Sequence, residues 1–227
     1  MPEAISLPPE QLSDGALAEA AVTVSASGST PPSTLLIACG ALAREILAVI
    51  EVNGLSGMAL ECLPATLHNR PERIPDAVRE KIRAARSRGI DSIHVVYADC
   101  GTGGLLDAVC EEEGVTRIAG PHCYAFFDGL DAFAARAEAE MGAFFLTDFL
   151  ARQFDTLIWK GMGLDRHPEL RDLYFAHYDR VVHLAQTDDP GLDAKAQAAA
   201  DRLGLRYERR KTGYGELADF VRDAAAS

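Results

Sequence analysis

The sequence predicts an α/β protein with a mostly parallel sheet covered by helices on both faces, Rossmann-like in outline. Short apolar runs rich in Val, Ile and Leu alternate along the 227 residues with amphipathic stretches at helical spacing. The apolar runs contain few polar positions, as is typical of strands that are buried on both faces. Glycines and prolines separate the two kinds of segment. This alternation predicts parallel strands joined by crossover helices.

The first 32 residues differ from the rest in composition. They are rich in Ala, Ser, Pro and Glu and end in Ser29-Thr30-Pro31-Pro32. Such a composition buries little apolar surface, so we expect a mobile N-terminal tail over residues 1–32. The α/β domain then occupies residues 33–227, with a possible division into lobes 33–142 and 143–227.

The first half of the domain carries four of the expected strands. Cys39-Gly40 ends the first strand, and Asn53-Gly54 ends the helix that follows it. Pro75 suits the first turn of the next helix, which Gly89 closes. The expected strands are 34–38, 59–63, 93–98 and 116–119, and the expected helices are 41–50, 76–88 and 105–113.

The second half continues the alternation. Gly142 ends a helix before the next strand, and Pro168 opens another helix after a loop dense in glycine and polar side chains. The expected strands are 143–147, 181–186 and 205–208, and the expected helices are 129–141, 149–158, 169–178, 192–203 and 216–225.

The stretch from Val95 to Gly104 is the most informative of the chain. A β-branched apolar run is followed by Asp99, Cys100 and Gly101-Thr102-Gly103-Gly104, after which helical character resumes at Leu105. This order predicts a strand, a tight turn and a helix. A thiol near a helix N-terminus is biased toward thiolate. Gly101, Thr102, Gly103 and Gly104 also suit a cradle for a cofactor phosphate, although neither the Walker lysine nor the complete dinucleotide fingerprint is present.

Three cysteines follow predicted strands. Cys39, Cys100 and Cys123 each come just after a strand, and His122 precedes Cys123. Because the carboxyl ends of parallel strands meet at one edge of a sheet, these side chains can converge. Three sulfurs and an imidazole are a ligand set for zinc, and sulfurs also hold iron. No Cys-x-x-Cys pair supports the site, and Cys62 and Cys110 are expected to be buried core residues.

A metal-free alternative uses the same residues. Cys100 would be the nucleophile, His122 its base, and Asp99 or Asp148 the residue that orients the base. The sequence does not separate this reading from metal ligation, because both need a thiolate beside an imidazole.

A further group of polar residues is predicted to bind a small polar substrate. Most of them lie at strand ends or in loops of the second half, where an arginine can grip a carboxylate at two points. Asp148 equally suits the start of the helix at Phe149, and His183, inside an apolar strand, is expected in the core. The substrate candidates are His68, Asp148, Arg152, Arg166, His167 and Gln186.

Charge and hydropathy exclude some partners. The formal net charge is −12, from 22 Lys and Arg against 34 Asp and Glu, which disfavours binding to nucleic acid or to anionic membranes. The most apolar stretch, residues 35–52, contains Arg44 and Glu45 and is too interrupted to span a bilayer. Without a predicted signal peptide, and with an odd number of cysteines, we expect a cytoplasmic protein with reduced thiols.

Several motifs together are similar to one known family. They are Leu36-Ile37-Ala38-Cys39-Gly40-Ala41-Leu42, Leu63-Pro64-Ala65-Thr66-Leu67-His68, Tyr97-Ala98-Asp99-Cys100-Gly101-Thr102-Gly103-Gly104, Gly120-Pro121-His122-Cys123-Tyr124, Phe145-Leu146-Thr147-Asp148-Phe149 and Gly163-Leu164-Asp165-Arg166-His167-Pro168-Glu169-Leu170. Between Leu35 and Phe220 the chain thus resembles the domain of unknown function 1638 (DUF1638) family. The resemblance implies no settled activity, but it implies an association with corrinoid-dependent methyltransferase systems.

This context favours one function. A zinc-bound thiolate is nucleophilic at neutral pH and can receive a methyl group. We therefore expect a metal-thiolate enzyme of methyl or one-carbon transfer, with zinc or iron held by Cys39, Cys100, His122 and Cys123 and with a corrinoid protein or methyltransferase as partner. The alternatives are a non-catalytic accessory protein that binds a small polar ligand, a corrinoid or the partner, and a metal-free cysteine-nucleophile enzyme.

Overall fold

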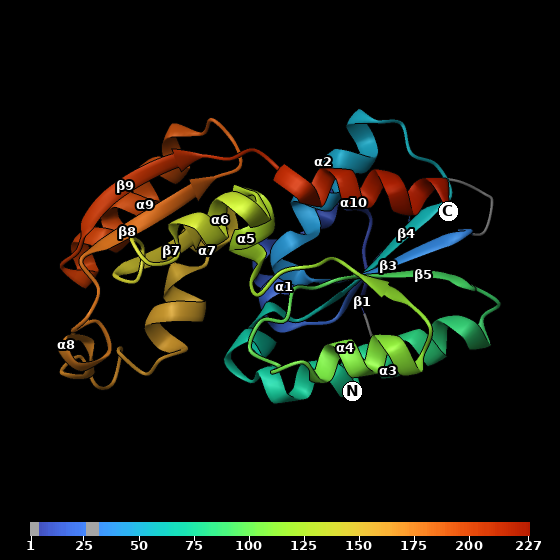
Figure 1. The fold of residues 1–227 in the computed structure, drawn as a ribbon, viewed down its shortest axis with the longest axis horizontal. Coiled ribbons are helices and arrows are strands. Elements are labelled where there is room, and N and C mark those ends of the chain that lie inside the picture. The colour runs from blue at the N-terminus through green and yellow to red at the C-terminus, as the bar shows by residue number, and fades with distance from the viewer. Residues whose placement is uncertain (1–4, 26–31) are drawn as a thin grey trace. The chain divides into compact units, whose positions relative to one another are not determined.

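A computed structural model describes residues 5–25 and 32–227, which fold into two compact units (Figure 1). Unit 1 comprises residues 1–123 and 217–227, and unit 2 comprises residues 124–216. The expected lobes met at residue 142, whereas the chain divides after Cys123 and its last eleven residues belong to unit 1. The helical stretch that precedes β7 therefore belongs to unit 2.

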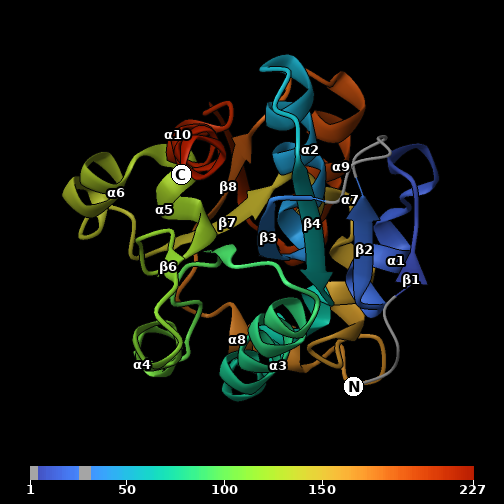
Figure 2. The ribbon, with the colours of Figure 1, turned by 90° about the vertical axis from the view of Figure 1, so that its right-hand side faces the viewer.

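Unit 1 is built on a six-stranded sheet with the order β1-β2-β4-β3-β5-β6. Strands β3 (Thr34–Cys39), β4 (Met58–Leu63), β5 (Ser92–Val96) and β6 (Thr116–Arg117) are parallel. Helices α3 (Ile74–Ser87) and α4 (Leu105–Glu112) cover one face, and α2 (Ala43–Val52) and α10 (Gly215–Ala226) cover the other (Figure 2). The predicted α/β class, with helices on both faces of a mostly parallel sheet, is confirmed.

Residues 5–25 correct the expectation of a mobile tail. They form β1 (Ile5–Ser6), the 3-10 turn η1 (Pro9–Gln11), α1 (Asp14–Glu19) and β2 (Val22–Ser25). Strand β2 pairs antiparallel with β4, and the side chain of Leu17 is fully buried. A few apolar residues among the serines and prolines therefore suffice to cover the edge of β4. Residues 1–4 and 26–31 of the expected tail lie outside the described residues.

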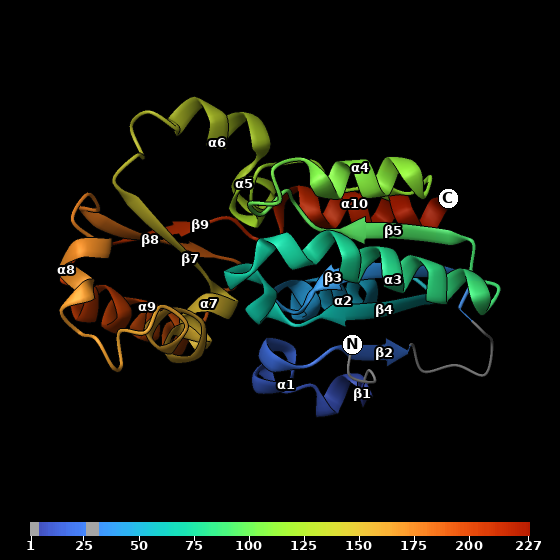
Figure 3. The same ribbon diagram turned by 90° about the horizontal axis from the view of Figure 1, so that it is seen from below.

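The other connections of unit 1 are short. Strand β3 leads through the 3-10 turn η2 (Gly40–Leu42) into α2, and β4 leads through η3 (Ala65–Asn69) and η4 (Pro71–Arg73) into α3. Figure 3 looks onto the face that α3 and α4 cover. Their apolar side chains and those of β3, β4 and β5 form one buried cluster. Glu61, buried in β4, is paired with Lys81 and Arg88 of the α3 region.

Unit 2 contains a three-stranded parallel sheet with the order β7-β8-β9. Its strands are β7 (Ala143–Thr147), β8 (Arg180–Ala185) and β9 (Arg206–Lys211), and its helices are α5 (Cys123–Asp128), α6 (Leu130–Arg136), α7 (Asp148–Arg152), α8 (Leu170–Tyr174) and α9 (Pro190–Leu203). The helix expected at 149–158 is instead α7 followed by the π-helical segment η5 (Phe154–Lys160). Among the described residues, no helix has the length and hydropathy needed to cross a membrane.

Candidate functional site

The carboxyl edge of the unit 1 sheet brings the first predicted residues together. Ala38 of β3 pairs with Val96 of β5, so Cys39 and Tyr97 are the next residues along the two neighbouring strands. Residues in this register point to the same face of a sheet. Accordingly, Cys39 and Cys100 both pack against the buried cluster that contains Tyr97. We call Cys39, Tyr97 and Cys100 the thiol site.

The carboxylate of Asp99 occupies the turn between β5 and α4. The carboxylate of Asp99 accepts hydrogen bonds from Thr102 Oγ1 (2.7 Å), Gly104 N–H (2.8 Å) and Gly103 N–H (3.2 Å). Burial would raise the pKa of Asp99, but these bonds, that of Gly104 first, hold it below its usual range. The amides that the sequence offers to a cofactor phosphate are therefore already bound, which disfavours a cradle at Gly101.

Cys100 has an unusual backbone conformation. Its φ of +49° is the only positive value of a non-glycine residue in the described part of the chain. Two hydrogen bonds hold the strand end in place: Asp99 N–H donates to Gly120 O and Cys100 N–H donates to Pro121 O, both at 2.9 Å. A left-handed conformation costs an ordinary residue about 1–2 kcal/mol and recurs at functional sites. The segment 120–121 thus fixes where the Cys100 thiol lies.

Both thiols of the site are neutral at pH 7. Burial, followed by the charge of Cys39, raises the pKa of Cys100 to about 12, while the backbone N–H of Cys123 opposes the shift. Burial also raises the pKa of Cys39, against the backbone N–H of Ala41. The expected bias of Cys100 toward thiolate is wrong, because α4 begins five residues later and burial dominates. Each sulfur nevertheless has a backbone N–H directed at it, which stabilises a thiolate once one forms.

Tyr97 adds a polar group that the sequence does not point out. Its side chain is only 2% exposed, and its hydroxyl lies against the Cys39 thiol without a hydrogen bond of ordinary geometry to any described residue. Burial, followed by the charge of Cys39, raises the pKa of Tyr97 well above its ordinary value. In the sequence Tyr97 is simply an aromatic residue at the end of an apolar run, so no local signal marks it.

The two histidines of unit 1 lie in loops beside this edge. His122 lies at the surface, where partial desolvation by the surrounding protein lowers its pKa and the charge of Asp99 partly restores it. His68, in η3, is also exposed, and its pKa is lowered by the protein around it and then by the charge of His122. The sequence predicts His122 beside the cysteines but gives no sign that His68, predicted as a substrate residue, comes near His122; both imidazoles are neutral at pH 7.

The four predicted metal ligands are only partly gathered. Cys39 and Cys100 influence each other's charge, and Cys123 contacts the Cys100 sulfur through its backbone N–H. Within residues 5–25 and 32–227, however, no group of three or more His, Cys, Asp or Glu side chains is arranged to hold a metal ion. The site therefore offers two sulfurs in one place, with His122 and Cys123 on the adjacent segment.

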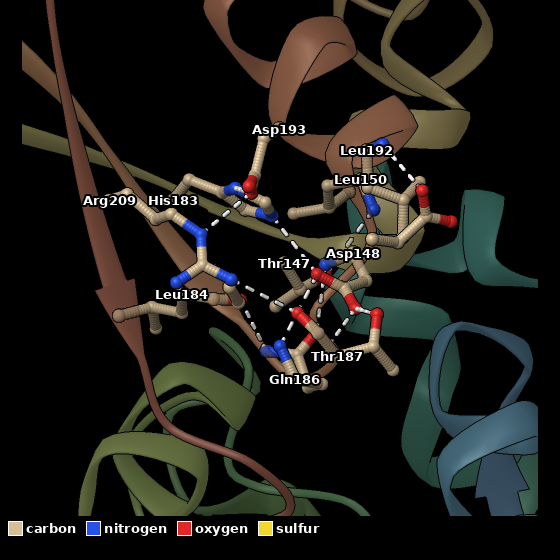
Figure 4. Close-up of polar contacts among 12 residues, drawn as sticks. Thr147, Asp148, Leu150, His183, Leu184, Gln186, Thr187, Leu192, Asp193 and Arg209 are labelled. Carbon is tan, nitrogen blue, oxygen red and sulfur yellow. Dashed lines mark hydrogen bonds and ion pairs between the residues drawn. The ribbon is translucent and has the colours of Figure 1, made fainter.

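The carboxyl edge of the unit 2 sheet holds a dense polar network (Figure 4). Asp148, 1% exposed, accepts hydrogen bonds from Thr187 Oγ1 (2.6 Å), Thr187 N–H (3.0 Å) and Gln186 N–H (3.3 Å). Its own N–H donates to Gln186 Oε1 at 2.7 Å. The structure thus joins Asp148 and Gln186, two of the predicted substrate residues, through bonds to each other.

His183 completes this network from inside the sheet. It is fully buried, as expected, and its Nε2 lies 3.0 Å from Asp148 Oδ1. Its Nδ1 lies 3.1 Å from the Tyr207 hydroxyl and 3.4 Å from Asp193 Oδ1, to which Arg209 Nε donates at 2.8 Å. Burial would raise the pKa of Asp148, but hydrogen bonds from His183 and Thr187 hold it below its usual range. The sequence missed this partnership, because it depends on the register of β7 and β8.

Two other predicted substrate residues, Arg166 and His167, make their contacts in a different loop of unit 2. Arg166 and His167 are exposed, and they pair within their own loop with Asp165 (3.9 Å) and Glu169 (3.2 Å). Arg152 lies one helical turn after Asp148 in α7. His68 belongs to unit 1, so the predicted substrate group is divided between the two units.

These features define a two-unit α/β protein with a thiol site at one sheet edge and a buried Asp-His network at the other. The chain belongs to the family described as "Protein of unknown function (DUF1638)", whose model matches residues 62–221. The match includes Cys100, His122 and Asp148 but not Cys39. No curated protein and no solved structure matches the chain.

Proposed function

We propose that unit 1 is a metal-thiolate enzyme of methyl or one-carbon transfer, in which Cys39 and Cys100 supply the sulfurs. One observation carries the proposal: Cys39 and Cys100 lie at the ends of neighbouring strands and pack against the same cluster. Each of the two sulfurs has a backbone N–H directed at it. Backbone N–H groups of this kind stabilise sulfur in its anionic form. The link to corrinoid chemistry, and to a corrinoid protein or methyltransferase as partner, rests on the family resemblance.

The raised thiol pKa values favour a metal-assisted thiolate over a metal-free nucleophile. A thiol with a pKa of about 12, such as Cys100, is almost wholly protonated at pH 7. A bound zinc or iron ion would replace that proton and keep the sulfur anionic at neutral pH. His122 and Cys123, on the segment beside Cys100, would provide further ligands, and a substrate would take the open position.

Residues of the chain have defined tasks in this proposal. The N–H groups of Ala41 and Cys123 hold the two sulfurs, and Asp99 fixes the turn that carries Cys100. All five cysteines are free, which suits a reducing compartment, so the proposal places the protein in the cytoplasm.

Elemental analysis of protein purified without added metal tests the proposal. We expect zinc or iron at close to one equivalent in wild type, most of it lost in Cys100→Ser and Cys39→Ser, and none lost in Cys110→Ser. Cys110 is a matched control, because it is a buried thiol in the middle of α4. Metal-free wild type that also fails to take up added zinc would overturn the proposal.

A second candidate is a non-catalytic accessory protein that binds a corrinoid, a small polar ligand or a partner methyltransferase. It is favoured by the neutral state of the thiols and by the lack of a three-ligand group among the described side chains. Thermal-shift measurements with cobalamins, folates and methylated amines separate the two candidates. Stabilisation by one of these ligands, without methyl transfer in a coupled assay, would support the accessory role.

A further inference from the structure

The backbone ladder between β5 and β6 is interrupted beside the thiol site. The last regular bond runs from Ile118 N–H to Val95 O at 3.0 Å. Pairing resumes two residues further on, where Asp99 N–H donates to Gly120 O at 2.9 Å. Between these bonds, no backbone N–H of the residues that the structure describes donates to Tyr97 O or Ile118 O. Both residues are buried, and buried carbonyls almost always accept a hydrogen bond, so another donor is expected here.

The guanidinium of Arg117, in β6, is that donor. Its Nη1 donates to Ile118 O at 2.8 Å and makes a longer contact of 3.5 Å with Tyr97 O. Its Nε and Nη2 donate to the two carboxylate oxygens of Asp107, in the first turn of α4, at 2.5 and 2.8 Å. The side chain of Arg117 is 13% exposed. One side chain thus ties the ends of two strands to the start of the next helix.

These contacts need the shape of arginine and not only its charge. A guanidinium carries five N–H donors in one rigid plane, so one side can grip a carboxylate while Nη1 serves two carbonyls. A lysine has the same charge, but its donors all sit on one nitrogen and cannot span the three acceptors. Arg117→Lys therefore separates the effect of the planar fork from the effect of the charge.

We propose that Arg117 is a positioning residue of the thiol site, which acts through residues 120–121. These residues accept the hydrogen bonds of the Asp99 and Cys100 N–H groups, both at 2.9 Å. They begin only two positions after Ile118, whose carbonyl Arg117 holds. The guanidinium thus fixes the spacing of the strand ends on which the place of the Cys100 sulfur depends. The inference deepens the proposed function and rests on it for the use of that sulfur.

Amide hydrogen exchange, resolved by residue with NMR, tests the hold of Arg117 on the turn without any metal. Local opening controls the exchange of such amides, and loss of a hydrogen bond that involves a charged group changes an equilibrium about tenfold or more. We therefore expect Arg117→Gln to raise exchange at Asp99 and Cys100 about tenfold or more relative to Ala38, in β3. Arg117→Lys should behave like Arg117→Gln.

Absorption spectra of cobalt(II)-loaded protein test whether this hold matters to the sulfurs. The visible and near-ultraviolet bands of thiolate-bound cobalt depend on the geometry around the metal. Arg117→Gln should shift these bands or weaken cobalt binding. A residue that only adds stability would leave the spectrum of the folded, loaded protein as it is.

Two further variants complete the design. Arg79→Gln is the matched control, because Arg79 also joins α3 to α4, through Glu112 at the far end of α4 (2.8 Å). It should leave both readouts unchanged. Asp107→Asn keeps the guanidinium but weakens its anchor, so it should raise exchange at the turn by a smaller factor. It carries the test if Arg117→Gln does not fold.

Four results would overturn the inference: exchange that rises equally at Ala38 and at the turn, wild-type exchange in Arg117→Lys, wild-type exchange in Asp107→Asn, or an unchanged cobalt spectrum in loaded Arg117→Gln. The two readouts keep this test apart from that of the proposed function. Locally faster exchange in Arg117→Gln, with a wild type that binds neither zinc nor cobalt, would reject the metal-thiolate enzyme and retain the hold of Arg117 on the turn.

Discussion

The carboxyl edges of the two sheets both bury polar side chains, but they differ in how far those side chains are hydrogen-bonded. In unit 2 the buried Asp148 and His183 bind each other and are surrounded by further donors and acceptors. In unit 1 the buried Tyr97 hydroxyl lies against the Cys39 thiol without a hydrogen bond of ordinary geometry to any described residue, and the two thiols of the site are neutral. A saturated polar network stabilises a fold, whereas polar groups with unused capacity indicate a place for a ligand. The contrast gives the unit 2 edge a role in stability and supports the proposal that chemistry takes place at the unit 1 edge.

The largest expected effect is on the stability of unit 2. Asp148→Asn removes the carboxylate that binds His183 and Thr187, and losing a buried hydrogen bond to a charged group costs about 1.5–3 kcal/mol per bond. Denaturant unfolding monitored by circular dichroism measures the loss. Asp188→Asn is the control: Asp188 is exposed and pairs with Lys211 at the surface, so little change is expected. A stable Asp148→Asn protein would remove the structural role that we give to this edge.

A part of the same loss should appear in acid. Because the pKa of Asp148 in the folded protein lies below its usual range, its contribution is complete above the unfolded pKa and is lost as the pH falls through the folded pKa. Wild type should therefore lose stability below the ordinary carboxyl range more steeply than Asp148→Asn does. Parallel curves of unfolding free energy against pH for the two proteins would show that Asp148 does not titrate with folding.

A smaller effect sharpens the view of the unit 1 turn. The positive φ of Cys100 favours glycine, so Cys100→Gly should be about 1 kcal/mol more stable than Cys100→Ala. At Cys110, inside α4, the order should reverse by a similar amount, because glycine is the poorer helix residue. Equal stabilities of the two Cys100 variants in urea unfolding would mean that the backbone there is not strained.

Local sequence patterns predicted most of the fold. The strand 143–147 was predicted with the bounds that β7 has, because an apolar run between Gly142 and Asp148 leaves few alternatives. The tail was predicted wrongly, because composition averages hide the few apolar side chains of α1 and β2 that contact β4. The change from α7 to η5 depends on packing that no local pattern carries.

The sequence predicts which residue types the candidate site contains, but not the contacts between them. Cysteines after strands, a polar turn and a nearby histidine can be read from the chain, and Cys39, Cys100 and His122 do lie at one edge. The hydroxyl of Tyr97 and the bond between Asp148 and His183 arise from strand register, which a single sequence does not specify. The prediction that Cys100 favours the thiolate was wrong for a similar reason: burial raises its pKa, and burial is a property of the whole fold.

The most direct test of the central claim is X-ray absorption at the metal edge of zinc-loaded protein. If the thiol site holds the metal, wild type should show sulfur scatterers at about 2.3 Å, and Cys39→Ser and Cys100→Ser should each lose sulfur relative to Cys110→Ser. A spectrum with only nitrogen and oxygen neighbours, or one that neither substitution changes, would contradict the assignment of metal-thiolate chemistry to this edge.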